Sequence, residues 1–433
     1  MEYHTGEATS RIDRHSIRRR SSMPAPYVSS SKTNTRSGTV LPEKYPTHIP
    51  ALDAIRGLAI LVVTLYRFRP SVEDASATCQ WLESFLVHGQ RGVDLFFVLS
   101  GFLITGILYD AKRHSHYFRN FYARRTLRIF PLYYGVLIGA LVILPLVWTT
   151  GYPFGATRDA QGWLWGYCTN LVIAWRGDWC FGYFDHFWSL AVEEHFYFLW
   201  PLVIYFSSRV VAQRWCLALA FVSAGTRIAC AAFTDNGPAV EVLTLFHLDA
   251  LLVGAWFALA SRGPRGLAGI VPTCRWLMPV SGVLLLPELL LHKRLLTVPD
   301  SLYALCFGAM IVLAVSAGPS SAFRRVWQSR VLRWLGKYSY GMYVFQLPLI
   351  PLFAYVFTAE SLAESIGSRL LGHLAYILLM LAATIGTAFA SWHLYEKHFL
   401  KWKRYFTSHP APPRSSQKEA SESSKTSEVS LAV

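Results

Sequence analysis

Charged residues are scarce in this chain of 433 residues, and their scarcity is the first constraint on its fold. Only 15% of the residues are Asp, Glu, Lys or Arg, whereas soluble domains carry about 25%. The deficit falls in long apolar stretches, because both ends of the chain are polar. An ordinary soluble domain is therefore excluded. Successive apolar runs of bilayer length predict an all-α integral membrane protein.

Several other signals are missing. The seven cysteines form no CxxC pair and show no metal-ligand spacing, so no metal site is expected. A disulfide between Cys168 and Cys180, which fall outside the apolar runs, is left open. No internal repeat is found, and without paired broken helices in two halves an ion-coupled transporter is disfavoured. The N-terminus has no apolar h-region, so we expect no cleaved signal peptide, and the run at 52–68 is expected to act as a signal anchor.

The apolar runs predict about ten transmembrane helices. They lie near 52–68, 92–109, 130–150, 187–206, 215–232, 243–261, 276–291, 300–318, 338–357 and 370–394. A further apolar piece at 163–175 is too short to span and is expected to be re-entrant or interfacial. The predicted organisation is a disordered basic tail at 1–46, a transmembrane domain at 47–406 and a disordered polar tail at 407–433.

Basic residues fix the predicted orientation. With the N-terminus inside, Lys and Arg concentrate in the inner loops and are sparse in the outer ones, as the positive-inside rule requires. This predicts an integral protein of the cell (inner) membrane with both termini cytoplasmic. The net charge of +15 follows from this layout and indicates attraction to anionic lipids. Nucleic acid is not an expected partner.

Two arginines interrupt the first run. Arg56 and Arg67 are eleven positions apart, which is about three turns plus 20°, so both lie on one helical face roughly 16 Å apart. An ionisable group inside a bilayer is costly and usually functional.

A second basic group, Arg124, Arg125 and Arg128, is expected in a loop after the second run. Arg125 and Arg128 are three positions apart and share a face if that segment is helical. Arginine forks suit a multiply charged phosphate, although a plain positive-inside cluster is the alternative. In the second run itself, Ser100 and Gly101 are interpreted as packing residues that permit close helix approach.

The fourth run opens with a polar stretch that includes Asp185 and His186 and then carries adjacent carboxylates, Glu193 and Glu194. His186 and Glu193 are seven positions apart and are predicted to share a face, with Ser189 close to it. This pattern indicates a stripe that handles protons or pairs with arginine. The alternative is a polar turn where the helix enters the interface.

Taken in order, these segments resemble the acyltransferase-3 family of integral membrane acyltransferases over about residues 48–404. The resemblance rests on six strings: Leu52-Asp53-Ala54-Ile55-Arg56-Gly57, Gly92-Val-Asp-Leu-Phe-Phe-Val-Leu-Ser-Gly-Phe-Leu103, Arg124-Arg125-Thr-Leu-Arg128-Ile-Phe-Pro131, His186-Phe-Trp-Ser-Leu-Ala-Val-Glu-Glu194, Leu248-Asp249-Ala-Leu and Gly336-Lys-Tyr-Ser-Tyr340.

The resemblance implies a membrane-bound O-acyltransferase. Such a protein moves an acyl group, commonly acetyl, from acyl-CoA to a hydroxyl of an extracytoplasmic glycan or lipid. Acyl-CoA is then a co-substrate, and no permanently bound cofactor is expected. The resemblance also implies that Arg56, Arg124, Arg125 and Arg128 hold the anionic CoA on the cytoplasmic side.

One residue departs from the family pattern at the position of the family's catalytic histidine. The family places a histidine eleven positions after the first-run arginine, taken as catalytic base or acyl-relay residue, and this chain has Arg67 there. An arginine cannot accept a proton near pH 7, but it can stabilise an oxyanion or pair with Glu193, Glu194 or Asp94.

Two functions follow from this departure. The first is an active O-acyltransferase in which His186 replaces the missing base, with Glu193, Glu194 and Arg67 as the other catalytic candidates. The second is a non-catalytic family member that binds acyl-CoA or lipid, or passes a lipid or glycan across the membrane.

Overall fold

The computed structural model describes residues 49–70, 77–148, 151–291, 297–318 and 321–407, all within the unit that begins at Lys44. These residues form helices and no β-strand, which confirms the all-α prediction for the described part of the chain. The tails expected at 1–46 and 407–433 lie outside the described residues, apart from Thr407.

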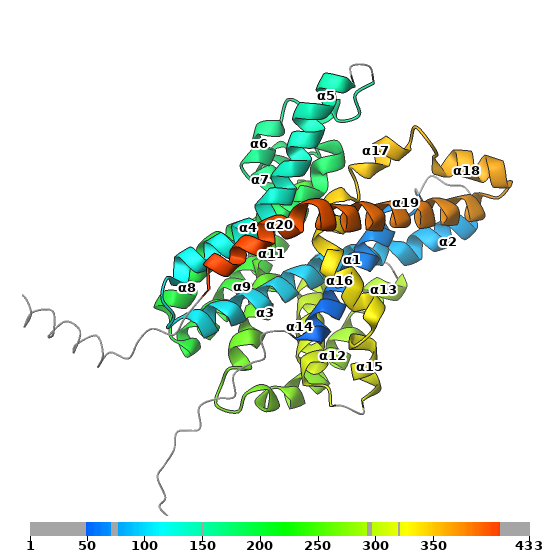
Figure 1. The fold of residues 1–433 in the computed structure, drawn as a ribbon. Helices are drawn as coiled ribbons and strands as arrows, with labels where there is room; N and C mark the ends of the chain where they lie inside the picture. The colour runs from blue at the N-terminus through cyan, green and yellow to red at the C-terminus, as the bar shows by residue number, and fades with distance from the viewer. Residues whose placement is uncertain (1–48, 71–76, 149–150, 292–296, 319–320, 408–433) are drawn as a thin grey trace, which may run out of the picture. The chain divides into compact units, whose positions relative to one another are not determined.

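The α-helices follow one another along the chain with short connections (Figure 1). They are α1 (Pro50–Arg67), α2 (Ala77–Leu86), α3 (Gly92–Ala111), α4 (Tyr117–Leu137), α5 (Leu144–Val147), α6 (Gln161–Trp165), α7 (Thr169–Arg176), α8 (Trp188–Phe206), α9 (Arg209–Phe233), α10 (Gly237–Val242), α11 (Thr244–Ala260), α12 (Val271–Leu284), α13 (Leu286–Leu291), α14 (Val298–Ser316), α15 (Ala322–Trp327), α16 (Arg330–Phe345), α17 (Leu349–Phe353), α18 (Ala359–Ile366), α19 (Arg369–Ser391) and α20 (Lys397–Leu400).

Tighter or wider turns join some of these helices. The 3₁₀ segments are η1 (Val87–Arg91), η3 (Gly155–Thr157), η4 (Gly182–Phe187), η5 (Leu267–Gly269) and η7 (Lys401–Tyr405), and the π segments are η2 (Ile138–Ile143) and η6 (Trp392–Glu396). Of these, η4 matters most for the site, because it sets the direction in which α8 begins.

Seven helical stretches of the described chain are long and apolar enough to cross a membrane. They are Thr78–Ala111, Tyr117–Val147, Arg209–Phe233, Gly237–Ala260, Val271–Leu290, Val298–Ser316 and Arg369–Tyr405. Three further predicted spans correspond to α1, α8 and α16, which carry ionisable side chains such as Arg56, Glu193 and Lys337. The structure supports an integral membrane protein, while ten crossings and cytoplasmic termini stay predictions.

The arginine-rich segment before the third predicted span is helical, and the expectation of a loop there is wrong. Helix α4 begins at Tyr117 and ends at Leu137, so Arg124, Arg125 and Arg128 lie near its middle. Arginine is a good helix former, and charge alone does not end a helix. Pro131 lies inside α4, and the chain continues helically beyond it as far as Val147.

The apolar piece at 163–175 is divided between two short helices, α6 and α7. Between them Tyr167 has a positive φ of 54°, and its ring stacks on Tyr133 with centroids 4.1 Å apart. The segment is thus not one spanning helix, as its length predicted. All seven cysteines are free, so the Cys168–Cys180 disulfide left open by the sequence is not formed.

Glycines set the closest helix contacts around the site. A Cβ on Gly101 of α3 would lie 1.8 Å from the carbonyl oxygen of Leu251 in α11, and one on Gly57 of α1 would lie 1.8 Å from that of Leu332 in α16. No side chain fits at either distance, so small residues let these backbones touch. The packing role predicted for Gly101 is confirmed, and these contacts hold α1 against α16 and α3 against α11.

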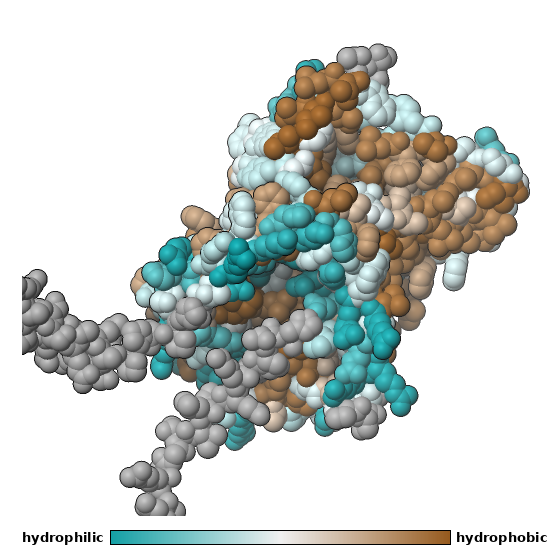
Figure 2. Space-filling model, viewed as in Figure 1, coloured by the Kyte–Doolittle hydropathy of each residue, from teal (hydrophilic) through white to brown (hydrophobic). Residues whose placement is uncertain are grey.

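The surface divides into apolar and polar regions (Figure 2). Hydrophobic side chains cover α5 and the region of α2, α18 and α19, whereas hydrophilic ones gather over α20 and around α15. Exposed apolar side chains such as Leu146, Trp175 and Leu378 are expected on helices that face lipid.

Candidate functional site

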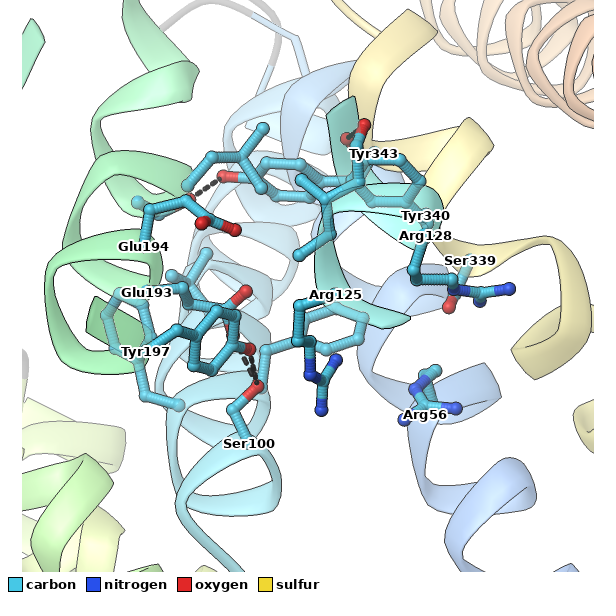
Figure 3. Close-up of a pocket in the computed structure, with 16 residues that line it drawn as sticks. Arg56, Ser100, Arg125, Arg128, Glu193, Glu194, Tyr197, Ser339, Tyr340 and Tyr343 are labelled. Carbon is cyan, nitrogen blue, oxygen red and sulfur yellow. Dashed lines mark hydrogen bonds between the residues drawn. The ribbon is translucent and has the colours of Figure 1, made fainter. Parts of the chain in front are cut away.

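A central cavity of about 110 Å³ lies between α1, α3, α4, α8 and α16 (Figure 3). Its basic side chains, Arg56, Arg125 and Arg128, come from α1 and α4. Its carboxylates, Glu193 and Glu194, come from α8 on the opposite side. The complete lining is Arg56, Val93, Phe96, Phe97, Ser100, Arg125, Arg128, Ile129, Ser189, Leu190, Glu193, Glu194, Tyr197, Ser339, Tyr340 and Tyr343.

Glu193 belongs to a compact hydrogen-bonded group. The Ser100 hydroxyl donates to Glu193 Oε1 over 2.5 Å and lies 3.0 Å from the hydroxyl of Tyr197. The guanidinium of Arg125 stacks over the Tyr197 ring at 4.9 Å from its centroid. Such a group can move a proton between a hydroxyl and a carboxylate.

Glu194, the adjacent carboxylate, is arranged differently. Its Oε1 is buried and makes no hydrogen bond with any described residue. A buried acceptor without a partner is costly, and it faces a cavity that already contains three guanidiniums. Glu194 therefore offers an unused acceptor to a molecule that enters the cavity.

A second pocket, of about 380 Å³, adjoins the central cavity and is called the basic pocket below. Six of its lining residues are cationic, and Asp53 is the acidic residue in the lining. The complete lining is Asp53, Arg56, Ile107, Phe121, Arg124, Arg125, Arg128, Gly336, Lys337, Trp392 and Lys403. The two spaces share Arg56, Arg125 and Arg128, so these guanidiniums stand at the boundary between them.

Most of the positive charge in the basic pocket is not neutralised by protein carboxylates. Arg56 lies 3.5 Å from Asp53, whereas Arg128 and Lys337 lie over the Trp392 ring at 5.5 and 5.3 Å from its centroid. Arg124 donates to the carbonyl oxygen of Phe406 over 3.4 Å. This excess of donors and charge suits an anion with several phosphate groups.

A third pocket, of about 650 Å³, is rich in carboxylates and is called the acidic pocket. Aromatic side chains also line it, among them Tyr66, Trp179 and Trp188. The complete lining is Tyr66, Arg67, Gln90, Arg91, Val93, Asp94, Trp179, Gly182, Asp185, His186, Trp188, Ala231, Thr234, Asp235, Gly237, Val240, Glu241, His247, Thr297, Asp300 and Leu347. It shares Val93 with the central cavity and no residue with the basic pocket.

Arg67 lines the acidic pocket and is absent from the lining of the central cavity. It is the last residue of α1, and its guanidinium lies 5.2 Å from the Tyr66 ring centroid. Within the described chain it forms no ion pair within 4 Å with Glu193, Glu194 or Asp94. The pairing considered from the sequence is thus not seen: Asp94 binds Arg91 at 3.2 Å, and Glu193 and Glu194 line the central cavity instead.

His186 faces the acidic pocket, whereas Glu193 lines the central cavity. His186 lies in η4, ahead of α8, and about two helical turns separate it from Glu193, so the two side chains reach different pockets and their shared face stays a prediction. His186 Nε2 lies 3.0 Å from the carbonyl oxygen of Tyr343. Its Nδ1 has no hydrogen-bond partner among the described residues.

Tyr343, on α16, connects the central cavity to His186 of the acidic pocket. Its hydroxyl donates to the carbonyl oxygen of His186 over 2.9 Å and lies 2.5 Å from the hydroxyl of Ser189. Ser189, Glu193 and Tyr197 are spaced by four residues along α8, so all three face the central cavity.

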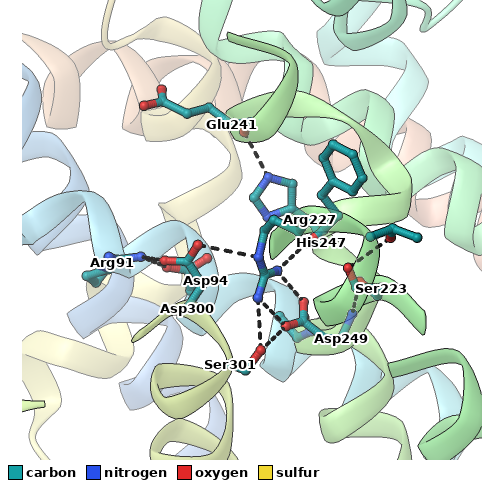
Figure 4. Close-up of polar contacts among 12 residues, drawn as sticks. Arg91, Asp94, Ser223, Arg227, Glu241, His247, Asp249, Asp300 and Ser301 are labelled. Atoms are coloured by element: carbon teal, nitrogen blue, oxygen red, sulfur yellow. Dashed lines mark hydrogen bonds and ion pairs between the residues drawn. The ribbon is translucent and has the colours of Figure 1, made fainter. Parts of the chain in front are cut away.

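Buried ion pairs support the wall of the acidic pocket (Figure 4). Arg227, which is 1% exposed, donates to both carboxylate oxygens of Asp249 over 2.9 and 2.8 Å. Arg91 donates to Glu288 over 2.6 Å and to Asp300 over 2.5 Å. These networks pair buried charges of opposite sign and hold α9, α11 and α14 together.

Several of these partners were not expected from the sequence. Tyr197 follows Glu193 by four residues, so helical spacing alone could have indicated it. Lys337 stands within the Gly336–Tyr340 string but had no assigned role. Ser100 was interpreted as a packing residue, although its hydroxyl bonds to Glu193. No local signal joins Arg227 to Asp249, which lie on different helices.

A family model described as an acyltransferase domain, acyltransferase-3, matches residues 49–396. OatA of Staphylococcus aureus (strain NCTC 8325 / PS 47), named an O-acetyltransferase, is 27% identical over 329 residues, 70% of this chain and 51% of that protein. YrhL of Bacillus subtilis (strain 168) is 28% identical over 388 residues, 81% of this chain and 54% of that protein.

OatA of Listeria monocytogenes serovar 1/2a (strain ATCC BAA-679 / EGD-e), named a peptidoglycan O-acetyltransferase, is 27% identical over 330 residues, 70% of this chain and 50% of that protein. The chain thus spans about half the length of the curated relatives that it matches. No solved structure matches it.

Proposed function

Because this chain belongs to the acyltransferase-3 family, we propose that it is a membrane-bound O-acyltransferase. It moves an acyl group, acetyl in the simplest case, from acyl-CoA to a hydroxyl of an extracytoplasmic glycan or lipid. The donor is taken from the cytoplasmic side, where the chain's termini are also predicted to lie.

One observation carries this proposal. The basic pocket opens at Arg56, Arg125 and Arg128 onto a cavity that contains a hydrogen-bonded carboxylate. The negatively charged phosphates of CoA suit the guanidiniums and ammoniums of the basic pocket. These include Arg124, which is not one of the three arginines shared with the central cavity. The thioester at the far end of the pantetheine arm then points into the central cavity.

The residues of the central cavity suit acyl transfer. Glu193 accepts the proton of an attacking hydroxyl, and the guanidiniums opposite it stabilise the oxyanion that forms at the carbonyl. Glu194 has a free acceptor oxygen that can orient a donor group of either substrate. His186 and Arg67 stay catalytic candidates, and both line the acidic pocket rather than the central cavity.

The acidic pocket is the proposed acceptor site. Indole rings stack on sugar faces, and carboxylates accept hydrogen bonds from sugar hydroxyls. Trp179, Trp188 and Asp185 offer these groups in one pocket. Two of the relatives, YrhL of Bacillus subtilis and OatA of Listeria monocytogenes, are named for peptidoglycan, which favours a glycan acceptor over a lipid for this chain as well.

The test uses membranes that contain the full chain, supplied with radiolabelled acetyl-CoA and a glycan fraction. We expect label in the glycan, and loss of both CoA binding and labelling in Arg128→Ala. Arg119→Ala is the matched control, because Arg119 is an exposed residue of the same helix outside the basic pocket. Equal loss in both variants would contradict the assignment of the CoA site.

The position of Arg67 favours a second function, a non-catalytic member that binds acyl-CoA or lipid, or passes a lipid or glycan across the membrane. An arginine cannot act as a base near pH 7, and the family's histidine is missing there. CoA binding without any acyl transfer, together with labelling gained by Arg67→His, would establish this alternative. Transfer by the unaltered chain would exclude it.

A further inference from the structure

Ser100 has an arrangement that packing does not require. Its neighbour Gly101 makes the tight contact with α11, and one residue on a helix turns the side chain by about 100°. Ser100 therefore points away from that contact, into the central cavity. There its hydroxyl donates to Glu193 over 2.5 Å and lies 3.0 Å from the hydroxyl of Tyr197 (Figure 3).

This arrangement has the parts of an activated nucleophile. A serine hydroxyl becomes nucleophilic when an adjacent base accepts its proton and a further group orients that base. Glu193 is the base, and Arg125 from α4 lies beside the pair, over the Tyr197 ring. Ser100, Glu193 and Arg125 come from three different helices, α3, α8 and α4.

Because the two proposed substrate pockets are separate, the acyl group has to be carried from one to the other. The basic and acidic pockets share no lining residue, and each shares at least one with the central cavity. That cavity, about 110 Å³, is smaller than the roughly 150 Å³ cavity that holds one benzene molecule. A space of this size suits an acyl group better than the end of a pantetheine arm and a sugar together.

We infer that Ser100 carries the acyl group between the two pockets as a covalent ester, with Glu193 as its base. The inference rests on the proposed acyl transfer and specifies its route. In the first step the Ser100 oxygen attacks the thioester carbonyl carbon and its proton passes to Glu193. The new C–O bond forms, the C–S bond breaks, and Glu193 returns the proton to the departing sulfur, so that CoA leaves as a thiol.

The second step reverses the first with a different nucleophile. After CoA has left, a hydroxyl of the acceptor enters the cavity from the acidic pocket and attacks the ester carbonyl, and Glu193 takes its proton. The C–O bond to Ser100 breaks as the new ester forms. Glu193 then returns the proton to the Ser100 oxygen, which restores the starting state. The guanidiniums of Arg56 and Arg125 line the same cavity and stabilise the oxyanion in both steps.

An exchange experiment tests the first step without any acceptor. Membranes containing the full chain are incubated with unlabelled acetyl-CoA and tritiated CoA, and label is measured in acetyl-CoA. A covalent intermediate makes this exchange possible, because the acetyl group can return to a second CoA molecule. We expect exchange by the wild type, none by Ser100→Ala, and a loss of at least about 100-fold in Glu193→Gln.

A second measurement identifies the residue that carries the acetyl group. Protein labelled with radioactive acetyl-CoA is digested, and the peptide that contains Ser100 is analysed for an acetyl ester. Ser100→Cys replaces the oxygen by sulfur, so a thioester released by neutral hydroxylamine is expected there. Ser281→Ala is the matched control, because Ser281 is a buried serine outside the three pockets whose hydroxyl bonds within its own helix.

The outcomes separate the inference from the function on which it rests. Exchange together with an ester on Ser100 supports both. A labelled acceptor without exchange or ester shows direct transfer, which overturns the inference and leaves the proposed function standing. Neither exchange nor a labelled acceptor overturns both. Exchange that persists in Ser100→Ala overturns the inference. If Ser100→Ala no longer binds CoA and Ser100→Cys forms no thioester, the role of the serine is structural and the inference fails.

Discussion

Substitution of Asp249 by alanine leaves the most deeply buried arginine of the described chain without its main partner. Arg227 is 1% exposed and gives Asp249 two charge-assisted hydrogen bonds. The remaining contacts of the guanidinium are the Ser301 hydroxyl at 2.8 Å, the carbonyl oxygen of Phe246, and Asp300 at 3.6 Å. None of them replaces a bidentate carboxylate.

The expected loss in the free energy of unfolding follows from this geometry. Removing one partner of a buried ion pair destabilises a protein by about 3–5 kcal/mol. Asp300 retains part of the compensating negative charge, so we expect the lower end, about 3 kcal/mol. A loss of this size corresponds to a fall in the melting temperature on the order of 3 °C.

The assay is thermal unfolding of the purified protein in detergent, followed with a thiol-reactive dye. Cys216 and Cys274 are buried, so their thiols become reactive as the helices separate. Glu364→Ala is the control, because Glu364 is an exposed carboxylate, and such changes stay within about 0.5 kcal/mol.

A double variant shows whether the isolated charge causes the loss. Replacing Arg227 and Asp249 together by leucine removes both charges, and such replacements are often neutral or stabilising. We expect the double variant to recover most of the melting temperature. An Asp249→Ala protein that melts with the control, or a double variant that melts as low as Asp249→Ala, would refute the reasoning.

Further predictions concern packing, chemistry and pH. Gly101→Ala places a Cβ 1.8 Å from the Leu251 carbonyl oxygen and should lower the free energy of unfolding by about 3 kcal/mol. Gly225→Ala is the control, because its Cβ would have nothing within 4 Å, and it should be neutral or stabilising. Equal melting temperatures of the two variants would contradict this prediction. Glu193→Gln should lower acyl transfer by about 10²–10⁴-fold and leave CoA affinity unchanged, and a weakened affinity would instead indicate a binding role. Burial raises the pKa of Asp185, which lies in η4 ahead of α8, to about 6. The folded protein then binds more protons than the unfolded chain between about pH 4 and 6, so the free energy of unfolding should fall as pH rises through that window. Asp185→Asn should remove this dependence, which is checked by measuring unfolding at a series of pH values.

Much of the fold follows from local sequence signals. Each of the predicted apolar runs overlaps a helix, because hydrophobic length and the need to satisfy backbone hydrogen bonds leave few alternatives in a membrane. The errors occurred where charge interrupts a helix. Arg124–Arg128 were expected in a loop but lie in α4. The helices α1 and α8 carry ionisable side chains of the site and are not apolar enough to count among the seven spans, and α16, with 16 residues, is shorter than any of them.

The candidate site was predicted less completely. Arg56, Arg125 and Arg128 were grouped from their residue types and family resemblance, and they do meet at one boundary. Tyr197 could have been found from helical spacing. Ser100 was misread because its neighbour Gly101 does pack against α11, and a sequence does not show which way a single small side chain turns.

The sequence by itself determined that the chain is helical and built for a membrane, and that one residue, Arg67, departs from its family's chemistry. These conclusions depend on composition and on spacing along single helices. Only the tertiary structure decided which side chains face one another. It placed Arg67 and His186 in the acidic pocket and joined Ser100 to Glu193. The reason is physical: a helix fixes only directions about its own axis, whereas contacts between helices depend on close approaches such as that of Gly101 to Leu251, which are properties of pairs of segments far apart in the chain.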